Sequence, residues 1–193
     1  MFQKSDKRSQ IFQAAFKLFA QKGFFHTTVE EVAQEAGIGK GTVYGYFASK
    51  QELLRQMLIF ATDYYFDTFF RVVEGNGGLK EKLVAIAKEH FRFFNEHREI
   101  AKVVLYEHRY ITDDLGDWLI EKEQGRIQYL VELLRSAAAN GEIRVVDFKM
   151  AARMITGALW NLGMEAVISS FSGTEEELAE GIIDILWLGL SRQ

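Results

Sequence analysis

The sequence predicts an all-α protein of about nine helices. None of its 193 residues is proline, which would end or kink a helix. Apolar residues recur at the spacing of one helical face along most of the chain, and the breaks between these segments are short and contain glycine. Because 48 % of the residues are hydrophobic, the helices can bury a core.

Three short helices are expected in the first 48 residues. The first covers residues 4–22 and the third covers about residues 40–47. Between them, "TTVEEVAQEAG" begins with a capping-box pattern, in which Thr27 or Thr28 precedes a glutamate by three residues. Gly37 supplies the turn that closes this second helix. Such a group predicts a helix-turn-helix head, and a three-helix module with a purely structural role fits the same spacing.

Charge is divided unevenly along the chain. Residues 1–55 contain eight Lys and Arg against five Asp and Glu, a balance of +3. Because the net charge of the whole chain is −4, the remaining residues carry −7. A basic head on an acidic body fits a head that binds a polyanion. Ordinary solvated surface charge explains the same numbers.

Six further helices are expected after residue 48. The fourth covers residues 49–73, and "EGNGG" at 74–78 forms a loop before the fifth. The sixth covers "REIAKVVLYEHR" and the seventh begins after a capping Thr112. We therefore expect a head of residues 1–48 and a helical bundle of residues 49–193.

The last two helices, at about 147–170 and 174–190, are apolar on more than one side. A helix of this kind must be covered on both sides, and a second copy of the chain would supply the cover through a four-helix, two-fold interface. A well-buried monomer core is the alternative. The interface residues expected are Ile155, Leu159, Gly163, Leu178, Ile182, Ile185, Leu186 and Gly189.

The head resembles that of one known family. The stretch "IFQAAFKLFAQKGFFHTTVEEVAQEAGIGKGTVYGYFASKQEL", residues 11–53, is similar in order and spacing to the DNA-binding head of the TetR/AcrR family of bacterial transcription regulators. The resemblance implies a repressor that binds a pseudo-palindromic double-stranded DNA operator as a homodimer. It also implies that residues 49–193 bind a small ligand and dimerise.

The resemblance assigns roles by position. Thr28, Tyr44 and Lys50 match residues that contact phosphates, while Lys40 and Gly41 match the start of the recognition helix. The chain departs from the family at two positions, where glycine replaces a larger residue. These positions are Gly39 and Gly45.

The third helix has a nearly bare outer face. At 100° per residue, Val43 and Phe47 mark its core side, opposite Gly41, Thr42 and Gly45. We expect Thr42 and Tyr46 to read bases, while Lys40, Tyr44, Lys50 and Thr28 bind phosphates. Packing of Tyr46 against the first helix is the alternative.

The body contains candidates for a ligand pocket. Aromatic residues crowd its helices, and a few polar residues interrupt apolar faces. Two body segments, "KEHFRFFNEHREIAKVVLYEHRY" and "ANGEIRVVDFKMAARMITGAL", resemble a subgroup that senses fatty acyl-CoA, which implies a small apolar effector. Ordinary core packing explains many of the same residues. The candidates are Phe60, Tyr64, His90, Phe94, Tyr106, Arg109, Tyr110, Trp118, Trp160, Asn161 and Glu165.

Other classes are disfavoured by composition. The chain has no cysteine, its four histidines lack metal-ligand spacing, and it has no phosphate-binding glycine loop. We expect no enzymatic activity, metal or cofactor. The polar N-terminus and the lack of a long apolar run favour the cytoplasm and no membrane contact. A helical small-molecule-binding or interaction protein without operator binding remains the alternative function.

Overall fold

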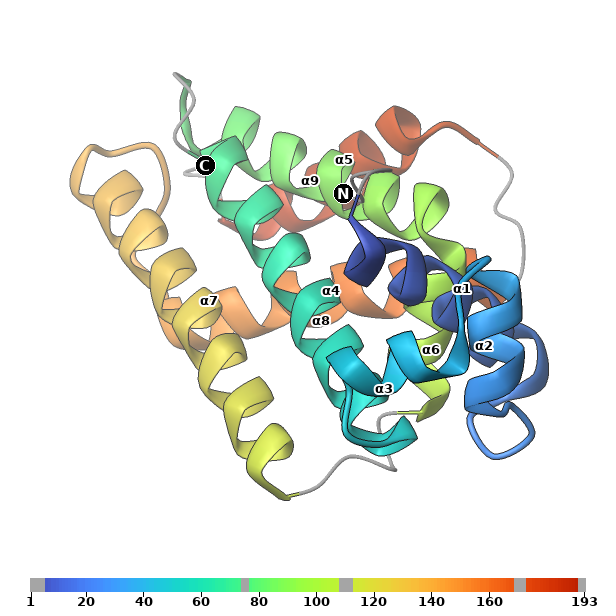
Figure 1. Ribbon diagram of the computed structural model, residues 1–193. Coiled ribbons are helices and arrows are strands. Elements are labelled where there is room, and N and C mark those ends of the chain that lie inside the picture. Colours follow the sequence, from blue (N-terminus) through green and yellow to red (C-terminus); the bar gives the residue numbers. More distant parts are fainter. Residues whose placement is uncertain (1–5, 74–76, 108–112, 169–172, 191–193) are drawn as a thin grey trace. The chain divides into compact units, whose positions relative to one another are not determined.

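The computed structural model describes residues 6–73, 77–107, 113–168 and 173–190. Those residues form nine α-helices and no β-strand, which confirms the predicted fold class (Figure 1). The helices are α1 (Lys7–Lys22), α2 (Val29–Glu35), α3 (Lys40–Tyr46), α4 (Lys50–Val73), α5 (Leu79–Glu96), α6 (Arg98–Glu107), α7 (Asp113–Ala139), α8 (Phe148–Ile168) and α9 (Glu175–Leu190).

The chain packs as two compact units. The head unit comprises Met1–Tyr65 and His97–Leu115, and the body unit comprises Phe66–Glu96 and Gly116–Gln193. Helix α4 therefore begins in the head unit and ends in the body unit. The division into a DNA-binding domain of residues 1–48 and a body of residues 49–193 stays a prediction.

The head unit is built around α1. Asp6 caps this helix by accepting from the backbone N–H groups of Arg8 and Ser9, both at 3.2 Å. The helix packs against α2 and α6, and the Phe12 ring lies 5.5 Å from that of Phe47 and 5.3 Å from that of Phe60. The apolar stripe of α1 is buried, namely Ile11, Ala15, Leu18 and Phe19.

The turn between α2 and α3 follows the predicted pattern. Gly37 adopts a φ of 68°, a left-handed conformation that glycine takes without steric cost. The Ile38 N–H donates to the Ala33 carbonyl at 3.0 Å, and Val43 is buried. These contacts hold α3 against α2.

The core of the body unit lies among α5, α7, α8 and α9, together with the end of α4. Helix α5 packs against both α8 and α9. Where α5 meets α8, Gly163 leaves room for the buried His90, because a Cβ at this glycine would lie 2.5 Å from His90 Nε2 and 3.2 Å from a ring carbon of Phe94. The guanidinium of Arg144 donates to the Gly189 carbonyl at 2.7 and 2.9 Å and so caps the C-terminal end of α9.

The expected dimer interface on α8 and α9 stays a prediction, and its residues differ in exposure. Ile155, Leu159 and Gly163 are buried within their own unit. Leu178, Ile182 and Leu186 are partly buried, whereas Ile185 and Gly189 are exposed. The large apolar residues exposed on these two helices are Met150, Met154, Trp160, Ile168, Ile185 and Leu188.

None of the described helices combines the length and the hydropathy that a membrane crossing requires.

The close approach at Gly163 predicts a large response to one added methyl group. We expect Gly163→Ala to lower the free energy of unfolding by about 1–3 kcal/mol, because the buried His90 has no room to move away. Gly125→Ala, in the exposed middle of α7 where a Cβ meets nothing within 4 Å, should be neutral or stabilising by up to about 1 kcal/mol. Urea denaturation followed by tryptophan fluorescence measures both, since Trp118, Trp160 and Trp187 all lie in the body unit. Equal stability of the two variants would contradict this account.

Candidate nucleic-acid interface

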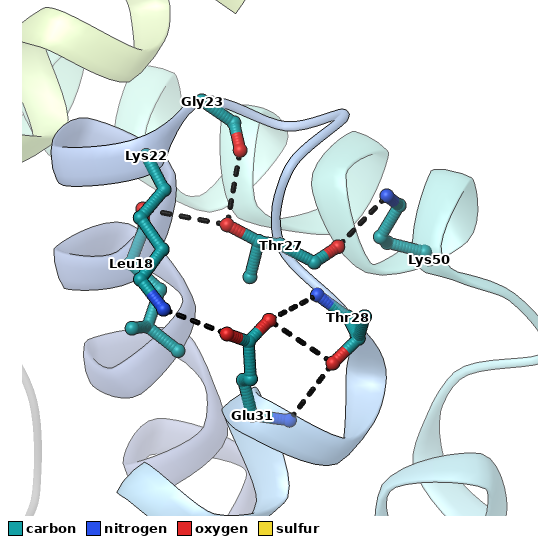
Figure 2. Close-up of polar contacts among 7 residues, drawn as sticks. All are labelled: Leu18, Lys22, Gly23, Thr27, Thr28, Glu31 and Lys50. Carbon is teal, nitrogen blue, oxygen red and sulfur yellow. Dashed lines mark hydrogen bonds and ion pairs between the residues drawn. The ribbon is translucent and has the colours of Figure 1, made fainter.

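The loop between α1 and α2 is held by a buried threonine. Thr27 is fully buried, and its hydroxyl donates to the Gly23 carbonyl at 2.9 Å and lies 3.4 Å from the carbonyl of Leu18 (Figure 2). Gly23 ends α1 with a φ of 81°. The loop therefore leaves α1 in a fixed direction.

Thr28 is the N-cap of α2, which resolves the two alternatives left by the sequence. Its Oγ1 accepts from the Glu31 N–H at 3.2 Å, and its own N–H donates to Glu31 Oε2 at 2.8 Å (Figure 2). The Lys22 ammonium donates to the other Glu31 oxygen at 2.6 Å. This ammonium, followed by the N–H and hydroxyl of Thr28, lowers the pKa of Glu31 to about 2, so its carboxylate stays charged at neutral pH.

Lys50, the first residue of α4, also holds this loop. Its ammonium donates to the Phe24 carbonyl at 2.8 Å and to the Thr27 carbonyl at 2.9 Å, and it lies 4.4 Å from the centre of the Phe24 ring. Figure 2 shows the bond to Thr27. Lys50 stays a predicted phosphate contact, to which the structure adds a role in positioning the residues next to Thr28.

The outer face of α3 is open. Val43 and Phe47 are buried, each with 1 % of its surface exposed, and they fix the opposite side of the helix to the core. A Cβ at Gly41 or Gly45 would meet nothing within 4 Å. Thr42 lies between these glycines and is partly exposed. A second backbone can therefore approach this face closely.

Exposed tyrosines flank this open face. Tyr44 is 48 % exposed and Tyr46 is 45 % exposed, so nearly half of each residue is open to a partner. Lys40 forms an ion pair with Glu30 and lies 5.9 Å from the centre of the Tyr44 ring. Gly39 is the N-cap of α3 and supplies no side-chain cap. Hydroxyl and ammonium donors in this arrangement suit phosphate oxygens and base edges.

In the body unit, three of the predicted pocket residues form one cluster. The rings of His90 and Phe94 are 4.6 Å apart, and that of Trp160 lies 5.8 Å from Phe94. Burial, and secondarily the charge of Arg126, lowers the pKa of His90 to about 3. Its imidazole is thus neutral at neutral pH. Trp118 is partly buried and lies 5.2 Å from the Lys122 ammonium.

Other predicted pocket residues lie elsewhere. Phe60 packs on Phe12 and Tyr64 on His97, all within the head unit. Tyr106 is 48 % exposed. Arg109 and Tyr110 fall outside the described residues.

Asn161 and Glu165 are exposed, and their place in a ligand pocket stays a prediction. Thr156 is the polar residue of α8 that is buried. No group of three or more His, Asp or Glu side chains suited to a metal ion occurs in the described ranges.

Two family models match the chain. The model of the bacterial regulatory proteins of the tetR family matches residues 11–57, and that of the tetracyclin repressor-like C-terminal domain matches residues 76–163. The chain belongs to the TetR family. This confirms the predicted family and function class, a transcription regulator with a helix-turn-helix head.

Relatives and solved structures agree with this assignment. This TetR-family chain is 25 % identical over 191 residues to the fatty acid metabolism regulator protein of Bacillus subtilis, covering 98 % of each chain. It is similar in fold to the regulator PfmR of Thermus thermophilus, with a TM-score of 0.80, 26 % identity, and 96 % and 98 % coverage. The structure of B. subtilis FadR in complex with stearoyl-CoA has a TM-score of 0.78 at 24 % identity, and covers 92 % and 96 %.

Sequence reasoning missed one buried charge in this TetR-family protein. Arg126 is 4 % exposed and lies on the buried face of α7 with Leu130 and Leu134. Its position four residues before Leu130 and eight before Leu134 was the available signal, since that spacing places it on the apolar stripe of the helix.

The contacts of Lys50 predict a change in the mobility of the loop. We expect Lys50→Met to make the Thr27 and Thr28 amide hydrogens exchange at least about tenfold faster, because two carbonyls of the loop lose a charged donor. Lys40→Met is the control, since the Lys40 ammonium contacts Glu30 and not this loop. Hydrogen exchange followed by NMR gives both rates. Unchanged rates in Lys50→Met would show that the loop does not depend on this side chain.

Proposed function

We propose that this protein is a repressor that binds a pseudo-palindromic operator as a homodimer in the cytoplasm and is released by a small apolar effector of the fatty acyl-CoA class. The observation that carries the proposal is the open face of α3 on the helix-turn-helix head. A protein that only bound a small molecule would have no need of an exposed Gly-Thr-Gly face flanked by two tyrosines.

The geometry of the head supports separate sets of residues for base contacts and for phosphate contacts. The glycine positions let the backbone of α3 approach the major groove, and Thr42 is the side chain between them. A threonine contacts base edges through its hydroxyl and thymine through its methyl group. Tyr46 adds a second contact to bases. Thr28, Lys40, Tyr44 and Lys50 bind phosphates, which position the duplex without reading sequence.

The exposed apolar faces of α8 and α9 support a homodimer. On α9, Ile185 is 74 % and Leu188 is 80 % exposed, and on α8, Met154 is 59 % exposed. Large exposed apolar side chains on a helix indicate a surface that a protein covers. A two-fold pair of such helices forms a four-helix interface and places two heads on the two halves of a palindrome. Ile182 and Leu186 are partly buried and border this surface.

Two observations support an acyl effector. The relative in B. subtilis is named a fatty acid metabolism regulator, and the B. subtilis FadR structure contains stearoyl-CoA. In the body unit of the present chain, the cluster of His90, Phe94 and Trp160 combines apolar rings with one neutral polar group, and Trp160 is the member that reaches the surface. Pockets for apolar ligands have this composition.

Selection of DNA by the purified protein tests the function. We expect enrichment of a palindromic sequence. The logarithm of the binding constant should fall linearly with the logarithm of the salt concentration. Lys40→Ala should weaken binding to all sequences alike and reduce the salt slope by about one unit. Thr42→Val should instead change the preferred base at one position of each half-site and leave the slope unchanged. Failure to enrich any sequence would favour the alternative, a small-molecule-binding protein without operator binding.

The oligomeric state tests the interface. We expect Ile185→Glu to convert the dimer to a monomer, because a charge would be buried in an apolar contact, and to weaken operator binding at least about tenfold. Ile120→Glu, at an isoleucine of α7 that is 55 % exposed, is the matched control and should stay dimeric. Analytical ultracentrifugation measures both variants. A dimer that survives Ile185→Glu places the interface elsewhere.

A further inference from the structure

Arg126 carries a charge inside the body unit. Only 4 % of this residue is exposed, although arginine is almost never fully buried unless it is paired. It occupies the stripe of α7 that also contains the buried Leu130 and Leu134. The helix thus directs a guanidinium toward the same core as two leucines.

Two aromatic rings and one carboxylate lie near this guanidinium. Its central carbon lies 5.9 Å from the ring centre of Phe66 and 6.0 Å from that of Phe69. Its Nε and one terminal nitrogen donate to the two carboxylate oxygens of Glu123 at 2.9 and 2.7 Å. The Glu123 side chain is 42 % exposed. The cation is therefore buried, while its carboxylate partner remains close to water.

A second buried polar group lies within range of this charge. His90 is 2 % exposed, it is hydrogen-bonded to the backbone of Leu159, and the positive charge of Arg126 helps to keep it neutral. The centre of its ring lies 4.6 Å from that of the Phe94 ring, and the two planes are tilted by 38°. A cation and a neutral imidazole are thus both buried in the body unit, where Thr156 is a further buried polar residue.

Stability alone does not account for this arrangement. A buried ion pair costs desolvation free energy and is often no more stable than apolar residues of the same volume. Recognition does account for it, because a guanidinium holds planar oxygen acceptors with two parallel hydrogen bonds. In a mostly apolar site, a small number of polar groups fixes the orientation of a largely apolar ligand.

We propose that Arg126 is the effector-recognition residue of the body unit and that it binds the oxygen at the end of an acyl chain, a thioester carbonyl or a carboxylate. The chain itself packs against the apolar side chains around it, including Phe66 and Phe69. The ligand oxygen takes a place beside or instead of Glu123, whose carboxylate returns readily to water because it is already partly exposed. This proposal rests on the proposed function and names the chemistry of its effector.

Three probes distinguish the chemistry of the ligand. Palmitoyl-CoA has a thioester carbonyl, S-hexadecyl-CoA is the thioether that lacks this oxygen, and palmitate has a carboxylate. Calorimetry below the micelle concentrations measures the binding of each to the full-length protein. We expect the wild type to bind palmitoyl-CoA or palmitate at least about tenfold more tightly than the thioether. The tighter of these two acyl probes identifies the source of the oxygen.

Matched variants test the role of the residue. Arg126→Met keeps the apolar stem and removes the charge, and it should lose the preference for the acyl oxygen, with binding at least about tenfold weaker. Arg135→Met is the control, since Arg135 lies on the same helix and pairs with Glu132 at the same spacing but is exposed. Its affinities should equal those of the wild type. If Arg126→Met does not fold, Arg126→Lys, which keeps the charge and loses the planar fork, should still reduce the preference over the thioether.

Two results would overturn the proposal. One is an Arg126 variant that folds and binds the acyl probes with wild-type affinity and preference. The other is a wild type that binds neither acyl probe at concentrations up to about 100 μM, well above the range of a specific effector. Operator binding by the same samples without effector separates this test from that of the proposed function. A wild type that binds no DNA rejects the repressor, whatever the role of Arg126.

Discussion

The geometry of the head depends on the two hydrogen bonds that Lys50 donates to the carbonyls of Phe24 and Thr27. These carbonyls belong to the loop between α1 and α2, and the residue after Thr27 is the N-cap of α2. Because α2 packs against α3, the placement of the recognition helix follows from that of the loop. A buried carbonyl that loses its donor costs about 1–3 kcal/mol, so alternative positions of the loop are disfavoured.

Packing against the core explains how α3 tolerates two glycines. Gly41 and Gly45 each cost about 1 kcal/mol relative to alanine, and a helix of seven residues is too short to be stable alone. Burial of Val43 and Phe47 contributes about 1.5–3 kcal/mol for each side chain, which offsets the cost of both glycines. Packing on the inner side thus stabilises the helix, and the outer side is left free of bulk.

The head was predictable from sequence because short-range rules determine it. The spacing of Thr28 and Glu31, the left-handed turn at Gly37 and the stripe of α1 each depend on neighbours within a few residues. The outward face of the body was not predictable in the same way. Helices α8 and α9 are apolar on several sides, so periodicity cannot tell Ile155, which is buried, from Ile185, which is exposed. Residue type did not reveal Arg126 either, because arginine is mostly exposed in proteins and this one is buried.

Release from an operator requires that the effector bind the two states of the protein with different affinity. A tenfold loss of operator affinity corresponds to about 1.4 kcal/mol of coupling, which is comparable to one hydrogen bond to a charged group. A single acyl oxygen at Arg126 is therefore sufficient in magnitude. Phe66 and Phe69, which flank this guanidinium, belong to α4, the helix whose first residue is Lys50. A ligand that changes the preferred position of these two rings acts on the same helix that holds the loop before Thr28.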